Sequence, residues 1–151
     1  MKIIESYFKK ILVTGGAGFI GNAVVRRLLK LTDCNICNLD KLGYASSLES
    51  IEKELLNLNN KNKYNFQKLD LLDKNKLEEL VFNFKPNLII HLAAESHVDR
   101  SIANSNTFIE SNIIGTYNLL EVSRKYWESL KENFQEKFRF HHVSTDEVFG
   151  S

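Results

Sequence analysis

Short apolar runs alternate with longer amphipathic segments along the whole chain, and this alternation restricts its fold more than any other feature. The apolar runs, each of a length suited to one strand, span residues 10–14, 35–39, 64–69, 88–92 and 138–144. The segments with helical spacing lie at about residues 19–31, 47–57, 74–84 and 107–134. Such alternation predicts stacked βαβ units, an α/β fold around a parallel sheet. Right-handed crossovers favour a doubly wound sheet with strand order 3-2-1-4-5.

The charge balance of the chain argues against two classes of partner. Its 151 residues include 20 Lys and Arg against 19 Asp and Glu, a net charge of +1, so no basic stripe is available for nucleic acid or an anionic membrane. With 43% hydrophobic residues, the chain suits one domain or part of one. No segment has the pattern of a signal peptide or of a membrane span. We therefore expect a cytoplasmic protein with neither kind of partner.

Two cysteines form a Cys-x-x-Cys pair, which is compatible with redox chemistry or a metal site. Cys34 and Cys37 flank or belong to the second predicted strand, where residues three apart point to opposite faces of a sheet. The two sulfurs then cannot meet at one ion. The sequence favours two small buried thiols and no metal site.

A glycine-rich turn follows the first predicted strand. Gly15, Gly18 and Gly21 have the spacing G-x-x-G-x-x-G. Glycine permits a tight turn, close approach of the backbone to a pyrophosphate and close packing of the helix on its strand. The N–H groups that begin the helix then favour phosphate. An ordinary strand-helix turn is the alternative, but the position in the first βαβ unit favours a dinucleotide site of the Rossmann type.

An acidic residue ends the second predicted strand, nineteen residues after the last glycine of the motif. There the carboxylate of Asp40 can accept hydrogen bonds from both hydroxyls of an adenine ribose and repel a 2′-phosphate. The adjacent Lys41 can soften that repulsion, and an aspartate that caps a turn is the plainer interpretation. The position in the motif favours NAD over NADP.

Weaker signals follow the third and fourth strands. Asp70 and Leu71 could contact the amino group and the flat face of adenine. Ala93 and Ala94 could let the backbone approach the cofactor, although ordinary packing explains two alanines as well.

Two polar segments occupy the edge where ligands bind in such sheets. Residues 95–101 combine an acid, a base, a cation and hydroxyls, a composition that suits a functional loop, although His97 alone is compatible with a surface histidine. Thr145, Asp146 and Glu147 follow the fifth strand. An adjacent Asp and Glu suggest a proton donor and a proton acceptor, while a turn or N-cap is an equal alternative.

Four segments together, residues 14–21, 40–44, 91–101 and 144–150, resemble the dTDP-glucose 4,6-dehydratases, a branch of the extended short-chain dehydrogenase/reductases. The resemblance implies a lyase that binds NAD, acts on dTDP-glucose or a related nucleotide sugar, and is a homodimer at full length. It implies that Thr145 orients the sugar 4-hydroxyl, Asp146 is the general acid and Glu147 the general base, with Ser96 and His97 also at the substrate. The cofactor-binding residues it indicates are Gly15, Gly18, Phe19, Ile20, Gly21, Asp40, Lys41, Asp70, Leu71, Leu92, Ala93, Ala94 and Asn112.

The chain departs from the family pattern at two places. It has Phe149 where the family usually has Tyr, and it ends at Ser151, before the Tyr-x-x-x-Lys motif, the later strands and the sugar-nucleotide subdomain. We therefore expect residues 1–151 to be a truncated NAD-binding domain without dehydratase activity of its own. The alternatives are another nucleotide-sugar dehydratase, a decarboxylase or an epimerase of the same superfamily, and a non-catalytic NAD-binding module. An epimerase has no need of the pair Asp146 and Glu147.

Overall fold

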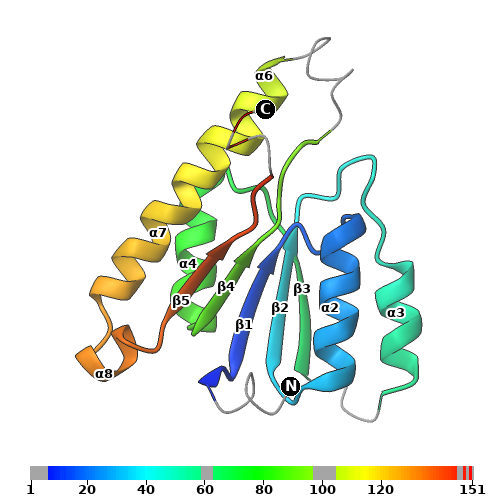
Figure 1. Cartoon of the computed structure of the whole chain (residues 1–151), viewed down its shortest axis with the longest axis horizontal. Helices are drawn as coiled ribbons and strands as arrows, with labels where there is room; N and C mark the ends of the chain where they lie inside the picture. Colours follow the sequence, from blue (N-terminus) through cyan, green and yellow to red (C-terminus); the bar gives the residue numbers. More distant parts are fainter. Residues whose placement is uncertain (1–6, 59–62, 97–104, 146–147, 149, 151) are drawn as a thin grey trace.

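The structure is a computed structural model that describes residues 7–58, 63–96, 105–145, 148 and 150. Its centre is a five-stranded parallel sheet with the order β3-β2-β1-β4-β5 (Figure 1). The strands are β1 (Lys10–Thr14), β2 (Asn35–Asp40), β3 (Tyr64–Lys68), β4 (Leu88–His91) and β5 (Arg139–His142). The helices are α2 (Phe19–Leu31), α3 (Glu49–Leu56), α4 (Lys74–Phe84), α6 (Ser105–Phe108), the π-helical η2 (Ile109–Gly115), α7 (Thr116–Glu128) and α8 (Glu132–Gln135). The predicted doubly wound sheet and its strand order are confirmed.

Helices cover both faces of the sheet, so the strands are apolar on both sides. Figure 1 shows α2 and α3 over one face and α4 and α7 over the other. Along β1, Ile11 and Val13 enter the core cluster under α2, while Leu12 enters the cluster under α4 and α7. This alternation follows from the two-residue period of a strand. The core is therefore two apolar layers separated by the sheet.

The two cysteines lie in different core layers. Cys34 belongs to the cluster under α2 and Cys37 to the cluster under α4, and both are buried free thiols. Burial raises the pKa of the Cys37 thiol to about 12, so it stays protonated at neutral pH. The prediction of two small buried thiols is confirmed.

The helix expected over residues 107–134 is divided, which corrects that prediction. Gly115 lies against Leu71, where an added Cβ would be 3.2 Å from the Leu71 Cβ, and the segment before it is π-helical. Helix α7 ends at Glu128, because the Ser129 hydroxyl donates to the Tyr126 carbonyl at 2.6 Å and competes with the next helical bond. The short helix α8 is tied back by Gln135, whose side-chain amide donates to the Trp127 carbonyl at 3.1 Å.

Strand β5 is shorter than the predicted run of residues 138–144. Phe138 instead bonds to α8, its N–H donating to the Phe134 carbonyl at 3.0 Å. No helix in the described part of the chain is long and apolar enough to cross a membrane.

Candidate functional site

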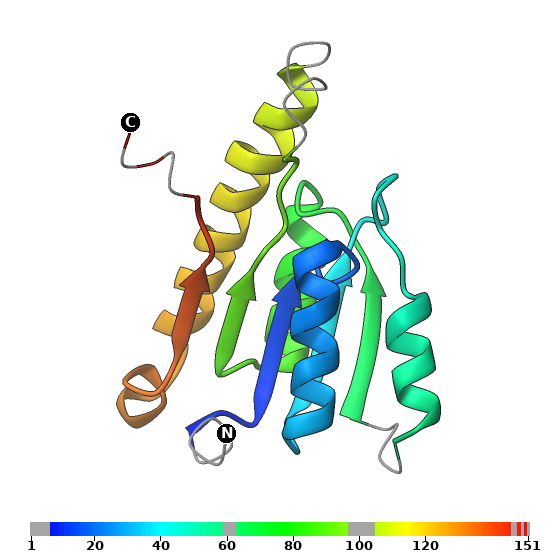
Figure 2. The ribbon, with the colours of Figure 1, turned by 45° about the vertical axis from the view of Figure 1, so that its right-hand side comes forward.

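The loops that follow the parallel strands gather at one edge of the sheet, where the strand arrows end (Figure 2). Parallel pairing sets Thr14 of β1 beside Leu39 of β2 and His91 of β4. On the far side of β4, the register sets His91 beside His142 of β5. The residues that leave these strands therefore begin close together.

The glycine turn after β1 is held by close backbone contacts. Gly15 has a φ of +73°, and its N–H donates to the Leu39 carbonyl at 2.8 Å. A Cβ on Gly15 would lie 2.6 Å from the backbone of Ala93, and one on Gly16 would lie 2.0 Å from the side-chain oxygen of Asn38. A Cβ on Gly21 would lie 2.1 Å from the Gly15 carbonyl oxygen. Glycine is required here because strand, turn and helix leave no space for a side chain.

The start of α2 is open to an anion. Gly18 provides no side-chain cap, and the first turn of the helix contains no acidic residue. The side chains of Phe19 and Ile20 are 94% and 60% exposed. The early N–H groups of a helix have no partner within the helix, so a phosphate can accept hydrogen bonds from them.

Asp40 lies against this turn with its carboxylate almost enclosed. The residue is 7% exposed. Its Oδ2 accepts the Ala17 N–H at 3.0 Å, and its Oδ1 accepts the Leu42 N–H at 2.8 Å and the Ser46 hydroxyl at 3.0 Å. The bond from Ala17 links the end of β2 directly to the glycine turn. The sequence places Asp40 at this edge, but it does not reveal these three donors.

A second set of contacts fixes the loop after β4. The side-chain amide of Asn112 accepts the Glu95 N–H at 2.8 Å and donates to the Glu95 carbonyl at 2.9 Å. The Lys41 ammonium forms an ion pair with the Glu95 carboxylate at 2.9 Å and approaches the Ser111 hydroxyl at 3.4 Å. Glu95 therefore joins the loop after β2 to the helix η2, a role without a sequence signal. It also neutralises Lys41, which weakens the effect of that cation on Asp40.

The other predicted cofactor residues have mixed surroundings. The Asp70 carboxylate accepts the Leu72 N–H at 3.0 Å and so closes a turn after β3. The Leu71 side chain is buried, and its carbonyl accepts the Asn118 side-chain amide at 3.0 Å. Leu92 packs against the core cluster under α2, and Ala94 is exposed. Their contact with a cofactor stays a prediction.

His91 is a buried polar residue that the sequence does not single out. Its Nδ1 lies 2.6 Å from the Thr14 hydroxyl and its Nε2 lies 2.9 Å from the Thr116 hydroxyl. Burial, and then the charge of nearby His142, lowers the pKa of the His91 imidazole to about 4. The neutral ring therefore links β1, β4 and α7 at neutral pH. A histidine within an apolar strand is the signal that could have found it.

We expect the chain to lose stability as the pH falls from about 6.5 to about 4. In the unfolded chain His91 titrates near 6.5, whereas in the folded chain its pKa is about 4, so the unfolded state binds more protons between these values. The stability that the neutral His91 ring contributes is fully present above pH 6.5 and is lost as the pH falls from 6.5 to about 4. It amounts to at most about 3 kcal/mol. Urea denaturation at pH 7 and pH 4.5 measures it. His91→Gln should flatten the dependence, whereas substitution of exposed His141 by Asn should not; equal slopes in both variants would contradict the assignment.

The predicted substrate and catalytic residues are only partly described. Ser96 and Thr145 are exposed, after β4 and β5 respectively. His97, Asp146 and Glu147 lie outside the described residues. The register of β4 and β5 begins both loops from neighbouring positions.

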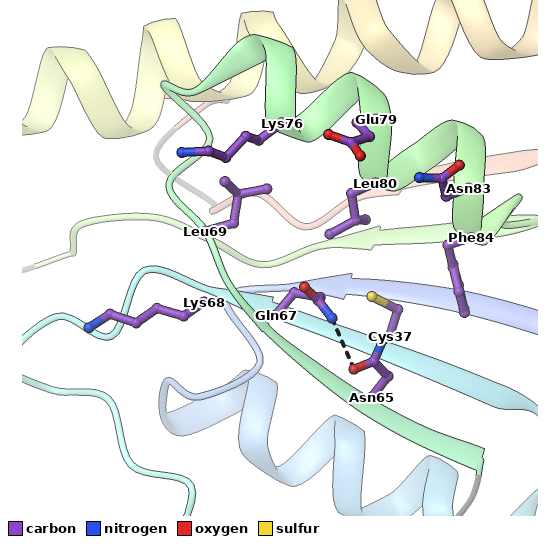
Figure 3. Close-up of a pocket in the computed structure, with 10 residues that line it drawn as sticks. All are labelled: Cys37, Asn65, Gln67, Lys68, Leu69, Lys76, Glu79, Leu80, Asn83 and Phe84. Carbon is purple, nitrogen blue, oxygen red and sulfur yellow. Dashed lines mark hydrogen bonds between the residues drawn. The ribbon is translucent and has the colours of Figure 1, made fainter.

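A groove lies between the sheet at β2 and β3 and the helix α4. Its volume is about 510 Å³. Figure 3 shows the residues that line it, which are Cys37, Asn65, Gln67, Lys68, Leu69, Lys76, Glu79, Leu80, Asn83 and Phe84. The predicted site residues are not among them. The Cys37 thiol stays protonated at neutral pH, so the groove has no thiolate for nucleophilic chemistry.

Comparison with protein families gives a match over nearly the whole chain. The family model described as GDP-mannose 4,6 dehydratase matches residues 12–151. The dTDP-glucose 4,6-dehydratase of Salmonella typhimurium is 52% identical over 141 residues, which are 93% of this chain and 38% of that protein. The chain therefore spans about two-fifths of the length of this relative.

Solved structures of similar fold include two kinds of enzyme. The dTDP-glucose 4,6-dehydratase DesIV from Streptomyces venezuelae, with NAD and TYD bound, has a TM-score of 0.74 and 37% identity, covering 94% of this chain and 41% of the other. The UDP-Glc/GlcNAc 4-epimerase from Campylobacter jejuni has a TM-score of 0.77 and 31% identity, covering 94% of this chain and 39% of the other.

Proposed function

The chain belongs to the family described as GDP-mannose 4,6 dehydratase, and from this we propose that it is the NAD-binding portion of a dTDP-glucose 4,6-dehydratase. The observation that carries the proposal is the position of Asp40, which is buried against a turn where Gly15, Gly16 and Gly21 leave no space for a side chain. The 52% identity to a dTDP-glucose 4,6-dehydratase supports the choice of substrate. The complete protein would convert dTDP-glucose to its 4-keto-6-deoxy form.

The residues at the sheet edge fit NAD. The glycine turn and the open start of α2 suit a pyrophosphate, and Asp40 suits an unphosphorylated ribose. Lys41, Asp70, Leu71, Leu92, Ala93, Ala94 and Asn112 complete the proposed set around the cofactor. A bound NAD would supply a reversible hydride acceptor, which would allow the glucosyl unit to be oxidised at C4 and later reduced at C6.

Three residues after β5 would act on the sugar. Thr145 would hold the 4-hydroxyl by a hydrogen bond, together with contacts from Ser96 and His97. Glu147 would accept the C5 proton once C4 is oxidised, because a neighbouring carbonyl makes that proton acidic. Asp146 would protonate the C6 hydroxyl as it leaves as water. The support is the family pattern and the common edge at which β4 and β5 end.

The structural similarity to a 4-epimerase makes epimerisation at C4 a second candidate activity. The pair Asp146 and Glu147 favours dehydration, since epimerisation at C4 needs no acid and base at C6 and C5. A non-catalytic NAD-binding module is the alternative from another class, and turnover of dTDP-glucose by the complete protein would exclude it. A cytoplasmic location, without nucleic-acid or membrane partners, stays a prediction from the sequence.

An exposed apolar stripe on η2 and α7 supports a homodimer of the complete protein. Ile109, Ile113, Tyr117 and Leu120 are each between 45% and 60% exposed. Their spacing of four, four and three residues sets them along one face of the helix. An apolar stripe of this kind suits burial against a partner surface, such as a second copy.

Titration calorimetry of the chain with NAD and NADP tests the cofactor. NAD should bind more tightly than NADP. Asp40→Ala should weaken the binding of NAD by about 10-fold to 150-fold, since a hydrogen bond to a charged group contributes about 1.5–3 kcal/mol. The same variant should show a smaller preference for NAD over NADP. Asp40→Asn, which keeps the shape of the side chain and removes its charge, should also reduce the preference for NAD over NADP.

Asp33 provides the matched control, because it precedes the same strand at its opposite end and pairs with Lys63 on the surface. Asp33→Ala should leave both affinities unchanged. Equal affinity of the unsubstituted chain for the two cofactors would defeat the assignment.

A further inference from the structure

The Asp40 carboxylate has too few free lone-pair positions to accept hydrogen bonds from both hydroxyls of a ribose, because protein donors already occupy most of them. An ionised carboxylate offers about four lone-pair positions. Ala17, Leu42 and Ser46 already occupy three of them. A ribose that donates both of its hydroxyls needs two positions. One of the three protein donors must therefore leave before the diol can bind in full.

Two of these donors are held by the backbone. The Ala17 N–H belongs to the glycine turn, and the Ala17 carbonyl is itself fixed by the Ser47 N–H at 2.8 Å. The Leu42 N–H belongs to the backbone of the turn after Asp40, where Leu42 has a φ of 60° in the left-handed region. Moving either donor would require a change of backbone conformation.

The third donor, the Ser46 hydroxyl, needs only a side-chain rotation. The backbone around it is tied, because the Ser46 N–H donates to the Gly43 carbonyl at 3.1 Å and the Asn22 side-chain amide donates to the Ser47 carbonyl at 2.9 Å. The hydroxyl can therefore turn away from Asp40 while the loop stays in place. Rotation about one bond is a fast motion of low cost.

We propose that Ser46 is a specificity residue whose hydroxyl occupies on Asp40 the place of one ribose hydroxyl and is released when the cofactor binds. This inference rests on the proposed NAD site. It gives Ser46 two opposite effects: the hydroxyl stabilises the loop of the free chain, and it lowers affinity for the ribose. Removing it should therefore tighten binding and lower the stability of the free chain together.

Calorimetry with NAD, ADP and 2′-deoxy-ADP tests the exchange. Ser46→Ala should bind NAD and ADP about 3-fold to 10-fold more tightly than the unsubstituted chain, since a neutral donor no longer competes for Asp40. The gain should be absent for 2′-deoxy-ADP, which donates one hydroxyl and needs one position. Without ligand, Ser46→Ala should melt at a lower temperature.

Two controls separate the hydroxyl from the shape of the loop. Ser47→Ala removes a hydroxyl that accepts the Glu49 N–H at 3.4 Å, and it should leave affinity for NAD unchanged. Ser46→Thr keeps the hydroxyl and should bind NAD as the unsubstituted chain does. In an Asp40→Ala background, the gain from Ser46→Ala should vanish, because the two residues act on one interaction.

The outcomes distinguish this inference from the function on which it rests. If the chain binds NAD and Ser46→Ala binds it equally or more weakly, the exchange is wrong while the NAD site stands. An equal gain for ADP and 2′-deoxy-ADP, or a gain in Ser46→Thr, would also overturn it. If the folded chain binds none of the three ligands, the NAD site and the exchange fall together.

Discussion

Alanine at Gly21 should destabilise the chain by about 3 kcal/mol or more, the upper end of the range for overpacking. In an ordinary helix the same change is favourable by about 1 kcal/mol, because alanine has the better helix propensity. Here the new Cβ would lie 2.1 Å from the Gly15 carbonyl oxygen and 2.7 Å from the Gly16 Cα. Both are backbone atoms, so relief requires that helix α2 move away from the turn after β1.

Urea denaturation followed by circular dichroism measures the effect on the free energy of unfolding. Gly43→Ala is the matched control, since its added Cβ meets only the end of the Lys41 side chain, at 4.0 Å. The urea concentration at the midpoint of unfolding should be nearly the same for that variant as for the unsubstituted chain. If Gly21→Ala also kept this midpoint, the close approach of α2 to the turn would not be a constraint on the fold.

The fold was largely predictable because its signals are local and periodic. The bounds of β1, α2 and α4 agree with the sequence pattern, and β2, β3 and β4 differ from it by one residue. Handedness and the first glycine turn then restrict the strand order. The break after α7 was not predictable in this way, because the Ser129 hydroxyl competes for a helix carbonyl only in the final geometry.

The site was predictable in position but not in its contacts. The glycine motif and Asp40 have a fixed spacing, so the sequence places them at one edge. The donors to Asp40 could not be predicted from the sequence, because the hydrogen bond from Ala17 joins residues 23 positions apart. His91 likewise reaches Thr14 across 77 positions. Such pairs have no shared spacing from which a sequence could reveal them.

Replacing either carboxylate after β5 should slow dehydration by about 10²-fold to 10⁴-fold, the usual contribution of a positioned proton-transfer group. The test needs a protein extended to the length of the dehydratase relatives, since this chain spans 38% of one of them. Glu147→Gln removes the proposed base, and Asp146→Asn removes the proposed acid. Formation of the 4-keto-6-deoxy sugar from dTDP-glucose measures the rate, with Glu136→Gln, an exposed residue after α8, as the control.

The two variants should differ in one further measurement, because their proposed roles concern different atoms of the sugar. In heavy water, Asp146→Asn should still exchange the C5 hydrogen with solvent, since the base is intact and only departure of the C6 hydroxyl is impaired. Glu147→Gln should lose both exchange and product. If either variant turns dTDP-glucose over at the rate of the unsubstituted protein, its role is wrong. If Glu147→Gln retains C5 exchange while Asp146→Asn loses it, the acid and the base are interchanged.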